Sequence, residues 1–282
     1  MNDYAEPPVI ADGYHPDLPR AVYDAIPALN YSVAKHGLKS MEHLRHAQTH
    51  PREMTDALRL GIALHLAVFE PGRFASEIGL VEKVDGRTKE GKAAKAKQLA
   101  DNADKLLTLD EDEYGDCKGM ASKLLSHPDV VLFMAQPGHC EPSCVWTDEQ
   151  TGVRLKSRLD RYAHAVQTLV DVKSTKDASP RGWPREVAHW DYHLQAAWYT
   201  EAIKRTRGED IDFYWACVEN EAPYSTAFYS IDLESLEQGQ KDMRAIIDQY
   251  AACLKSGVWT GYPTDVVLSS GLPVYRLERS RI

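Results

Sequence analysis

Two acidic residues and a lysine lie close together in a stretch of alternating polar and apolar residues. Asp160 ends the segment GVRLKSRLD, and Asp171 and Lys173 belong to the segment LVDVKST. With the period of two that a strand imposes, Asp171 and Lys173 share one face while Val170 and Val172 point into the core. The two segments are consecutive and joined by a short connection, which favours antiparallel pairing. We therefore expect Asp160 to lie near Asp171 and Lys173.

This juxtaposition favours metal-assisted attack on phosphorus. Two carboxylates about 4 Å apart repel by about 4 kcal/mol at the effective dielectric of a protein surface, so either one is protonated or a cation lies between them. Hard oxygen ligands beside an ammonium suit Mg²⁺ or Mn²⁺ better than zinc. Such an ion acidifies its bound water, and Lys173 is placed to position or deprotonate that water. The alternative is a solvated strand face on which Asp171 and Lys173 form a weak salt bridge.

Three further side chains could serve the same site from predicted helices. His65 lies among apolar residues at helical spacing in the segment Asp56–Glu70, where a histidine is more often a core residue than a ligand. Gln195 and Tyr199 are four residues apart on one helix face and could reach a common site or simply contribute to packing.

Basic residues and tryptophans near these strands are candidates for DNA contacts. Alternation places several cations on one strand face, and others follow in the next loop; the alternative is an ordinary solvated face. The candidate phosphate contacts are Arg154, Lys156, Arg158, Arg161 and Lys176. Trp183, Trp190 and Trp198 could stack on DNA ends, with Trp198 more typical of a core.

The composition predicts a folded protein outside the membrane. The 282 residues are 43% hydrophobic and 27% charged, and no apolar run reaches the roughly 18 residues of a membrane helix. The first residues lack the pattern of a secretory signal, and five scattered cysteines do not suggest a disulfide framework. We expect a cytoplasmic protein. A net charge of −9 argues against binding of nucleic acid by overall charge but allows a local basic groove.

The order of predicted elements indicates an α/β fold, with a central mixed β-sheet flanked by helices and an N-terminal helical part. A helix begun by a Ser32 cap, the helix at Asp56–Glu70 and a charged helical region at 85–128 come first. Strands at 144–148, 152–162 and 166–175 follow, then one helix at 185–206, strands at 212–220 and 225–233, and a last helix from Leu233 to about Lys255. Without repeats or linkers, we expect one domain over 1–282: an irregular segment at 1–55, a core at 56–262 and a tail at 263–282.

In this order the motifs resemble the PD-(D/E)XK nuclease superfamily, which has a restriction-endonuclease-like core. The matching pieces are GxxxHxxxxE at Gly61, His65 and Glu70, then RLD, DVKST and QAAWY. The similarity is greatest to the RecE, or exonuclease VIII, type and covers roughly residues 28 to 262. Asp171 stands where much of the superfamily has Glu, and the RecE-type branch also has Asp there.

The resemblance implies a role for each site residue. Mg²⁺, which Mn²⁺ can replace, would be held by His65, Asp160, Asp171 and the main-chain carbonyl of Val172. Lys173 would be the catalytic lysine, and Gln195 and Tyr199 would contact it and the DNA.

The resemblance also implies an activity and partners. It predicts a Mg²⁺-dependent exodeoxyribonuclease that degrades one strand of linear double-stranded DNA from the 5′ end and leaves 3′ tails for recombination by strand annealing. It further predicts a phage or prophage setting, a RecT-like single-strand annealing protein as partner, and a homo-oligomeric ring of three or four copies. Two alternatives stay open: a DNA-end-binding or scaffold protein of this fold without turnover, and a single-strand nuclease or endonuclease. The complete acid–acid–lysine set favours an active enzyme.

Overall fold

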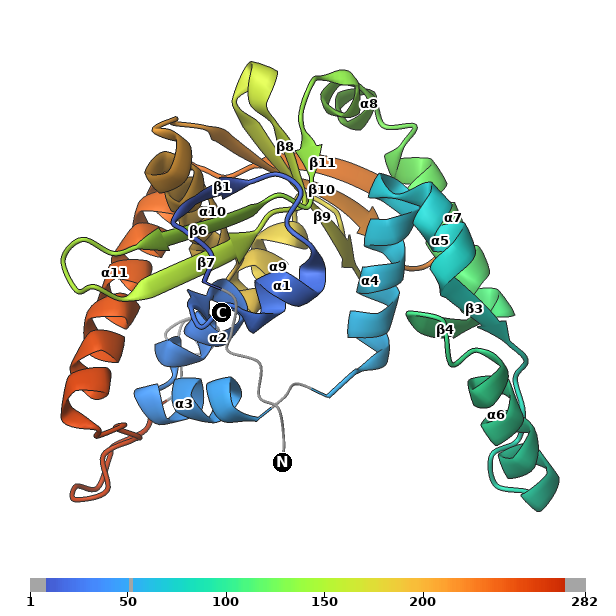
Figure 1. Cartoon of the computed structure of the whole chain (residues 1–282), viewed down its shortest axis with the longest axis horizontal. Coiled ribbons are helices and arrows are strands. Elements are labelled where there is room, and N and C mark those ends of the chain that lie inside the picture. The colour runs from blue at the N-terminus through green and yellow to red at the C-terminus, as the bar shows by residue number, and fades with distance from the viewer. Residues whose placement is uncertain (1–8, 51–52, 272–282) are drawn as a thin grey trace, which may run out of the picture.

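A five-stranded mixed sheet lies at the centre of the computed structural model, which describes residues 9–50 and 53–271 (Figure 1). Its strand order is β11-β10-β9-β8-β5, with β9 and β10 parallel and the other neighbours antiparallel. The strands are β5 (His139–Cys140), β8 (Arg161–Ala163), β9 (Thr168–Thr175), β10 (Asp212–Glu219) and β11 (Thr226–Ser230). This confirms the predicted mixed sheet flanked by helices.

The crossover between the parallel strands β9 and β10 consists of two helices, α9 (Trp183–Trp190) and α10 (Tyr192–Arg207). The sequence predicts one continuous helix here, and that prediction is wrong at Asp191. This residue has φ 58° and ψ 37°, a left-handed conformation that Asp adopts more readily than most residues. Asp191 therefore ends α9 after Trp190, and α10 begins at Tyr192.

Each face of the sheet carries its own hydrophobic core, as the alternation along β9 and β10 requires. Leu169, Phe213 and Trp215 pack on one face in the same cluster as residues of α10 and of α11 (Leu233–Ser256). Val170 and Val172 lie on the other face with residues of α4 (Asp56–Phe69), α7 (Glu111–Leu124) and α8 (Pro128–Ala135). Asp171 and Lys173 therefore lie on the face that α10 covers.

A second sheet packs beside the first, with the order β1-β6-β7-β2. Its strands are β1 (Gly13–His15), β2 (Leu29–Asn30), β6 (Ser143–Thr147) and β7 (Arg154–Arg158). The sequence predicts one strand over 152–162, but the structure divides it into β7 and β8, which belong to different sheets. Only β8 pairs antiparallel with β9. Leu159 and Asp160 form the connection between β7 and β8.

Short helices precede and follow α4. They are α1 (Arg20–Ala25), α2 (Tyr31–Ala34), the 3₁₀ turn η1 (Lys35–Leu38), α3 (Met41–Thr49) and α5 (Pro71–Glu77). The predicted Ser32 cap is wrong, because Asn30 caps α2 by accepting a hydrogen bond from the Val33 amide. A second 3₁₀ turn, η2 (His164–Val166), joins β8 to β9.

The predicted helical region at 85–128 contains helices and an unpredicted strand. The strand β4 (Leu107–Asp110) separates α6 (Lys89–Asp101) from α7 and pairs in parallel with β3 (Ile78–Val81). Helix α6 projects from the body of the molecule (Figure 1). All five cysteines are free, in agreement with the sequence, and no helix within the described ranges has the length and apolar character to cross a membrane.

Candidate active site

The candidate site forms where β8 ends beside β9. Arg161 pairs with Val170, so the backbone of Val172 extends past the start of β8. The Asp160 carboxylate fills this position, and its Oδ2 accepts a hydrogen bond from the Val172 amide at 2.8 Å. A short strand thus places an acidic side chain beside the part of β9 that β8 leaves unpaired.

His65 approaches the same edge from α4. Its Nε2 lies 3.2 Å from the Val172 carbonyl oxygen and 3.5 Å from Asp160 Oδ2. The His65 side chain is 27% exposed, with the Phe69 ring edge-on to it at 5.9 Å. A histidine that meets a carboxylate and a carbonyl differs from an apolar core residue, so the structure favours the interpretation that places His65 in the site.

Asp171 and Lys173 face α10 from β9. Asp171 is fully buried, and its Oδ2 forms an ion pair with the Lys173 ammonium. Gln195 Nε2 donates to Asp171 Oδ1 at 3.2 Å and to the Tyr199 hydroxyl at 3.1 Å. The four-residue spacing of Gln195 and Tyr199 therefore does bring both side chains to one place.

Sequence reasoning did not single out Tyr192, which also contacts the site. Its ring lies 4.9 Å from Lys173 Nζ, at the first residue of α10. Tyr192 is three residues before Gln195, a spacing that places two side chains on one helix face. The sequence therefore held the signal, because the predicted helix at 185–206 already contained both residues.

Burial and charge set the protonation of the central pair. Burial raises the pKa of Asp171 to about 6, because a carboxylate loses its hydration, while the Lys173 ammonium acts in the opposite direction. Burial alone would lower the pKa of Lys173, but the attraction of Asp171 outweighs it and the pKa lies above its usual value. The pair is thus a buried ammonium beside a carboxylate.

The chemistry of the donor set fits a divalent cation that prefers oxygen. Asp171 Oδ2 is buried and accepts no hydrogen bond from the described residues, although Lys173 lies against it. The carboxylate of Asp160 and the carbonyl of Val172 lie on the same strand edge. Within residues 9–50 and 53–271, however, no three His, Cys, Asp or Glu side chains are gathered as a metal cluster. Lys173 and Gln195 engage Asp171 instead.

Two of the candidate DNA-contact residues are buried cations of β7 and β8. Lys156 is only 5% exposed, and its Nζ donates to the carbonyl oxygens of Tyr23, Asp24 and Ile26 at 2.8, 3.1 and 2.9 Å. Arg161 is 7% exposed and donates to the Gln136 carbonyl at 2.7 Å. The structure gives no support to the predicted DNA contacts of Lys156 and Arg161, because both cations are buried and bind carbonyl oxygens inside the fold.

The two remaining cations of β7 also bind the N-terminal segment. Arg158 donates to the Leu18 carbonyl at 2.8 Å and pairs with Glu141 at 3.0 Å, and its side chain is mostly buried. Arg154 donates to the Ile10 carbonyl. The predicted phosphate contacts of Arg158 and Arg154 therefore have no support from the structure and stay predictions. Lys176 is exposed after β9, and its DNA contact stays a prediction.

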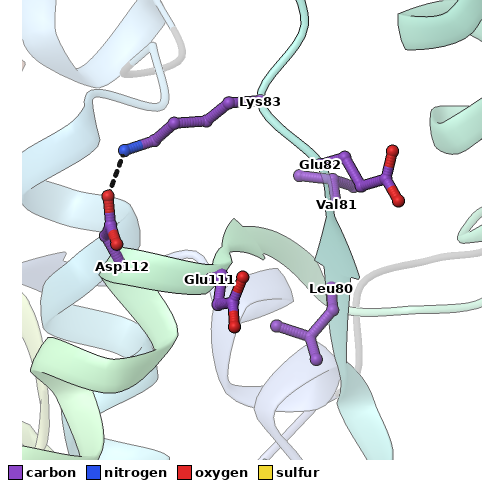
Figure 2. A pocket seen from close by; sticks show the side chains of 6 residues that line it. All are labelled: Leu80, Val81, Glu82, Lys83, Glu111 and Asp112. Carbon is purple, nitrogen blue, oxygen red and sulfur yellow. Dashed lines mark hydrogen bonds and ion pairs between the residues drawn. The ribbon is translucent and has the colours of Figure 1, made fainter.

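A hollow of about 480 Å³ lies between β3 and the start of α7, and none of the predicted site residues lines it. Figure 2 shows Lys83 and Asp112 facing one another there, with their charged groups 2.5 Å apart. Glu82 and Glu111 also line the hollow. This acidic rim is unsuited to DNA phosphates, so the site at β9 remains the better candidate.

Comparison with known proteins supports the superfamily. Residues 32–266 match the family described as "PDDEXK-like domain of unknown function (DUF3799)". No curated protein matches the sequence.

Solved structures add evidence on the fold. The crystal structure of a candidate exonuclease from Eubacterium rectale aligns with a TM-score of 0.60 and 14% identity, covering 93% of this chain and 98% of that one. The structure of SSO0001 aligns over 77% of this chain and 85% of its own at 14% identity, but its TM-score of 0.31 is too low to inform the fold. Because the family match covers well over half of the sequence, the chain belongs to this PDDEXK-like family and, through it, to the PD-(D/E)XK nuclease superfamily.

Proposed function

We propose that the protein is a divalent-metal-dependent exodeoxyribonuclease that digests one strand of linear duplex DNA from its 5′ end. The observation that carries the proposal is the meeting of Asp160, Asp171 and Lys173 at the edge of β9, with His65 beside them. The candidate exonuclease from Eubacterium rectale has a similar fold and supports the end-directed activity. Mg²⁺ is the proposed ion and Mn²⁺ its substitute.

The proposed cation would be held by His65, Asp160, Asp171 and the Val172 carbonyl. When bound, it would supply a Lewis acid at the phosphate and an acidified water. The chain contributes the positioning: the Val172 amide fixes Asp160, and Gln195 fixes Asp171. Such preorganised groups avoid the cost of reorganisation during the reaction.

Lys173 would provide the positive charge nearest the reacting phosphate. Its ammonium is held between the Asp171 carboxylate and the face of the Tyr192 ring, which fixes its direction. A fixed ammonium in a largely buried site stabilises charge that develops on phosphate oxygens more strongly than one in water. Lys173 can also orient the attacking water by donating a hydrogen bond.

The alternative of a DNA-end-binding protein without turnover is disfavoured by the same residues. Burial destabilises the ionised form of the Asp171 carboxyl, and binding of DNA ends alone does not require such a group. Buried ionisable groups with shifted pKa values are typical of active sites.

The test uses linear duplex DNA labelled at either the 5′ or the 3′ end, with Mg²⁺, beside a closed circular duplex. We expect early release of the 5′ label, slow loss of the 3′ label, and an intact circle. The matched control is Asp171→Ala, which should abolish hydrolysis and leave the fold intact, and Asp160→Asn tests the second acid with its shape preserved. Cleavage of the circle would indicate an endonuclease, and no cleavage of any substrate would favour the binding protein.

The RecE-type resemblance extends the proposal to assembly and partner. We propose a ring of three or four copies that acts beside a RecT-like annealing protein. Light scattering on the eluted protein measures the number of copies, and a monomer at micromolar concentration would contradict the ring.

A further inference from the structure

Trp190 is the most exposed of the three tryptophans near the site. It is the last residue of α9 and is 44% exposed, whereas Trp183 and Trp198 are 3% and 0% exposed. The two buried tryptophans cannot stack on DNA in this fold. Trp190 is therefore the one of these three tryptophans whose ring a ligand can reach from solvent.

The chain ties Trp190 to the candidate active site in two ways. Its carbonyl oxygen accepts a hydrogen bond from the Tyr31 hydroxyl at 3.0 Å, and the Tyr31 ring lies 6.4 Å from that of Tyr199. Trp190 is also two residues before Tyr192, whose ring covers Lys173. Because consecutive Cα atoms are 3.8 Å apart, the Trp190 backbone lies within about 8 Å of that of Tyr192.

The Trp190 ring is held in place and has a cation beside it. Its Nε1 donates to Glu186 Oε2 at 2.9 Å, which fixes the ring against its own helix. Lys35 Nζ lies over the ring, 5.9 Å from its centroid. A rigid and partly exposed aromatic ring suits a nucleotide base, because bases stack on aromatic side chains.

We propose that Trp190 is a stacking platform for the terminal base of the DNA substrate. This inference rests on the proposed exonuclease function and specifies how an end is distinguished from the interior of a duplex. Only an open end presents an unstacked base face, so the platform selects ends without reading sequence.

The test compares binding of a blunt linear duplex with a dumbbell of the same sequence, whose ends are closed by loops. Binding is measured by fluorescence anisotropy in EDTA, which prevents cleavage. Wild-type protein should prefer the open duplex. Trp190→Ala should weaken binding of the open duplex by about 5- to 150-fold, the range for loss of one base–aromatic stack, and bind the dumbbell as wild type does.

Two further variants serve as controls. Trp190→Phe retains a ring and should recover part of the affinity for open ends. Tyr262→Ala removes a ring that is 60% exposed beyond the end of α11 and should leave both affinities unchanged. A second measurement on wild-type protein uses 5-iodouracil at the terminal position, whose photocrosslink should map to Trp190.

The outcomes separate this inference from the proposed function. Unchanged binding by Trp190→Ala, or a terminal crosslink that maps elsewhere, overturns the platform even if linear DNA is still degraded. Wild-type protein that binds neither duplex and cleaves neither overturns the proposed function itself. If Trp190→Ala does not fold, the crosslink on wild-type protein decides.

Discussion

Replacing Lys156 by Met should weaken the fold and leave DNA binding unchanged. The Lys156 ammonium donates to three carbonyl oxygens at residues 23, 24 and 26, where α1 ends, and also lies 4.7 Å from the centroid of the Tyr23 ring. Methionine keeps the apolar stem but removes every donor. Lys176→Met is the matched control, because Lys176 is an exposed cation after β9.

The magnitude follows from the lost contacts. Hydrogen bonds from a charged donor contribute about 1.5–3 kcal/mol each, and the cost of burying the ammonium offsets several kcal/mol of that sum. We therefore expect the free energy of unfolding to fall by about 2–4 kcal/mol. An unfolding entropy of about 0.6 kcal/mol/K, for 282 residues at about 2.1 cal/mol/K each, converts this into a melting temperature lower by about 3–7 °C. Lys176→Met should stay within about 1 °C of wild type.

The assay pairs thermal melting with the salt dependence of DNA binding. If Lys176 contacts one phosphate, its variant should reduce the slope of log K against log salt by about 0.9, and Lys156→Met should leave that slope unchanged. The reverse result would refute the reasoning. A Lys156→Met protein that melts normally but loses one unit of salt slope would show that this lysine faces DNA.

Three further predictions concern the site itself. Lys173→Ala should bind DNA ends and Mg²⁺ nearly as wild type does but lose cleavage by several orders of magnitude; near-normal turnover would show that Lys173 has no part in the reaction. His65→Ala should lose activity, partly recovered by Mn²⁺, while melting near the wild-type temperature; a destabilised but fully active variant would place His65 in the core. Because the pKa of Asp171 is raised to about 6, the folded state binds this proton more tightly than the unfolded state does. The protonated group therefore stabilises the metal-free protein below about pH 4, and this contribution to the free energy of unfolding is lost as pH rises through 6. Denaturant titrations of wild type and Asp171→Asn between pH 4 and 7 measure this contribution, and a constant difference between the two curves would contradict it.

The centre of the site was predictable because it depends on short-range order. Alternation along β9 alone determines that Asp171 and Lys173 share a face, and helix periodicity alone determines that Gln195 and Tyr199 share another. Predicting the position of Asp160 depended on the antiparallel pairing of two consecutive strands, which their short connection favours. Placing His65 beside them depended on the family resemblance, because no local pattern relates α4 to β9.

The roles of the basic residues were not predictable from the same periodicity. Alternation correctly places Lys156 and Arg158 on one face of β7 but does not reveal what covers that face. Residues 10–26 cover it, and their carbonyl oxygens take up the cations. The break at Asp191 was hidden for a related reason: the residues on both sides have helical periodicity, and only the tertiary structure selects the left-handed conformation there.

Because the cations of β7 bind the chain itself, we expect DNA to follow another path across the molecule. Cations that bind backbone carbonyls inside the fold cannot also attract phosphates, so β7 offers no basic ladder for DNA. Three exposed cations follow β9 in the sequence, in the next loop and the first turn of α9: Lys176, Arg181 and Arg185. Trp190 ends that same helix, and Tyr192 beyond it touches Lys173. DNA bound along α9 would therefore meet exposed cations, an exposed ring and the candidate catalytic lysine in one continuous stretch of chain. DNA bound along β7 would meet only cations that already bind carbonyl oxygens of the chain.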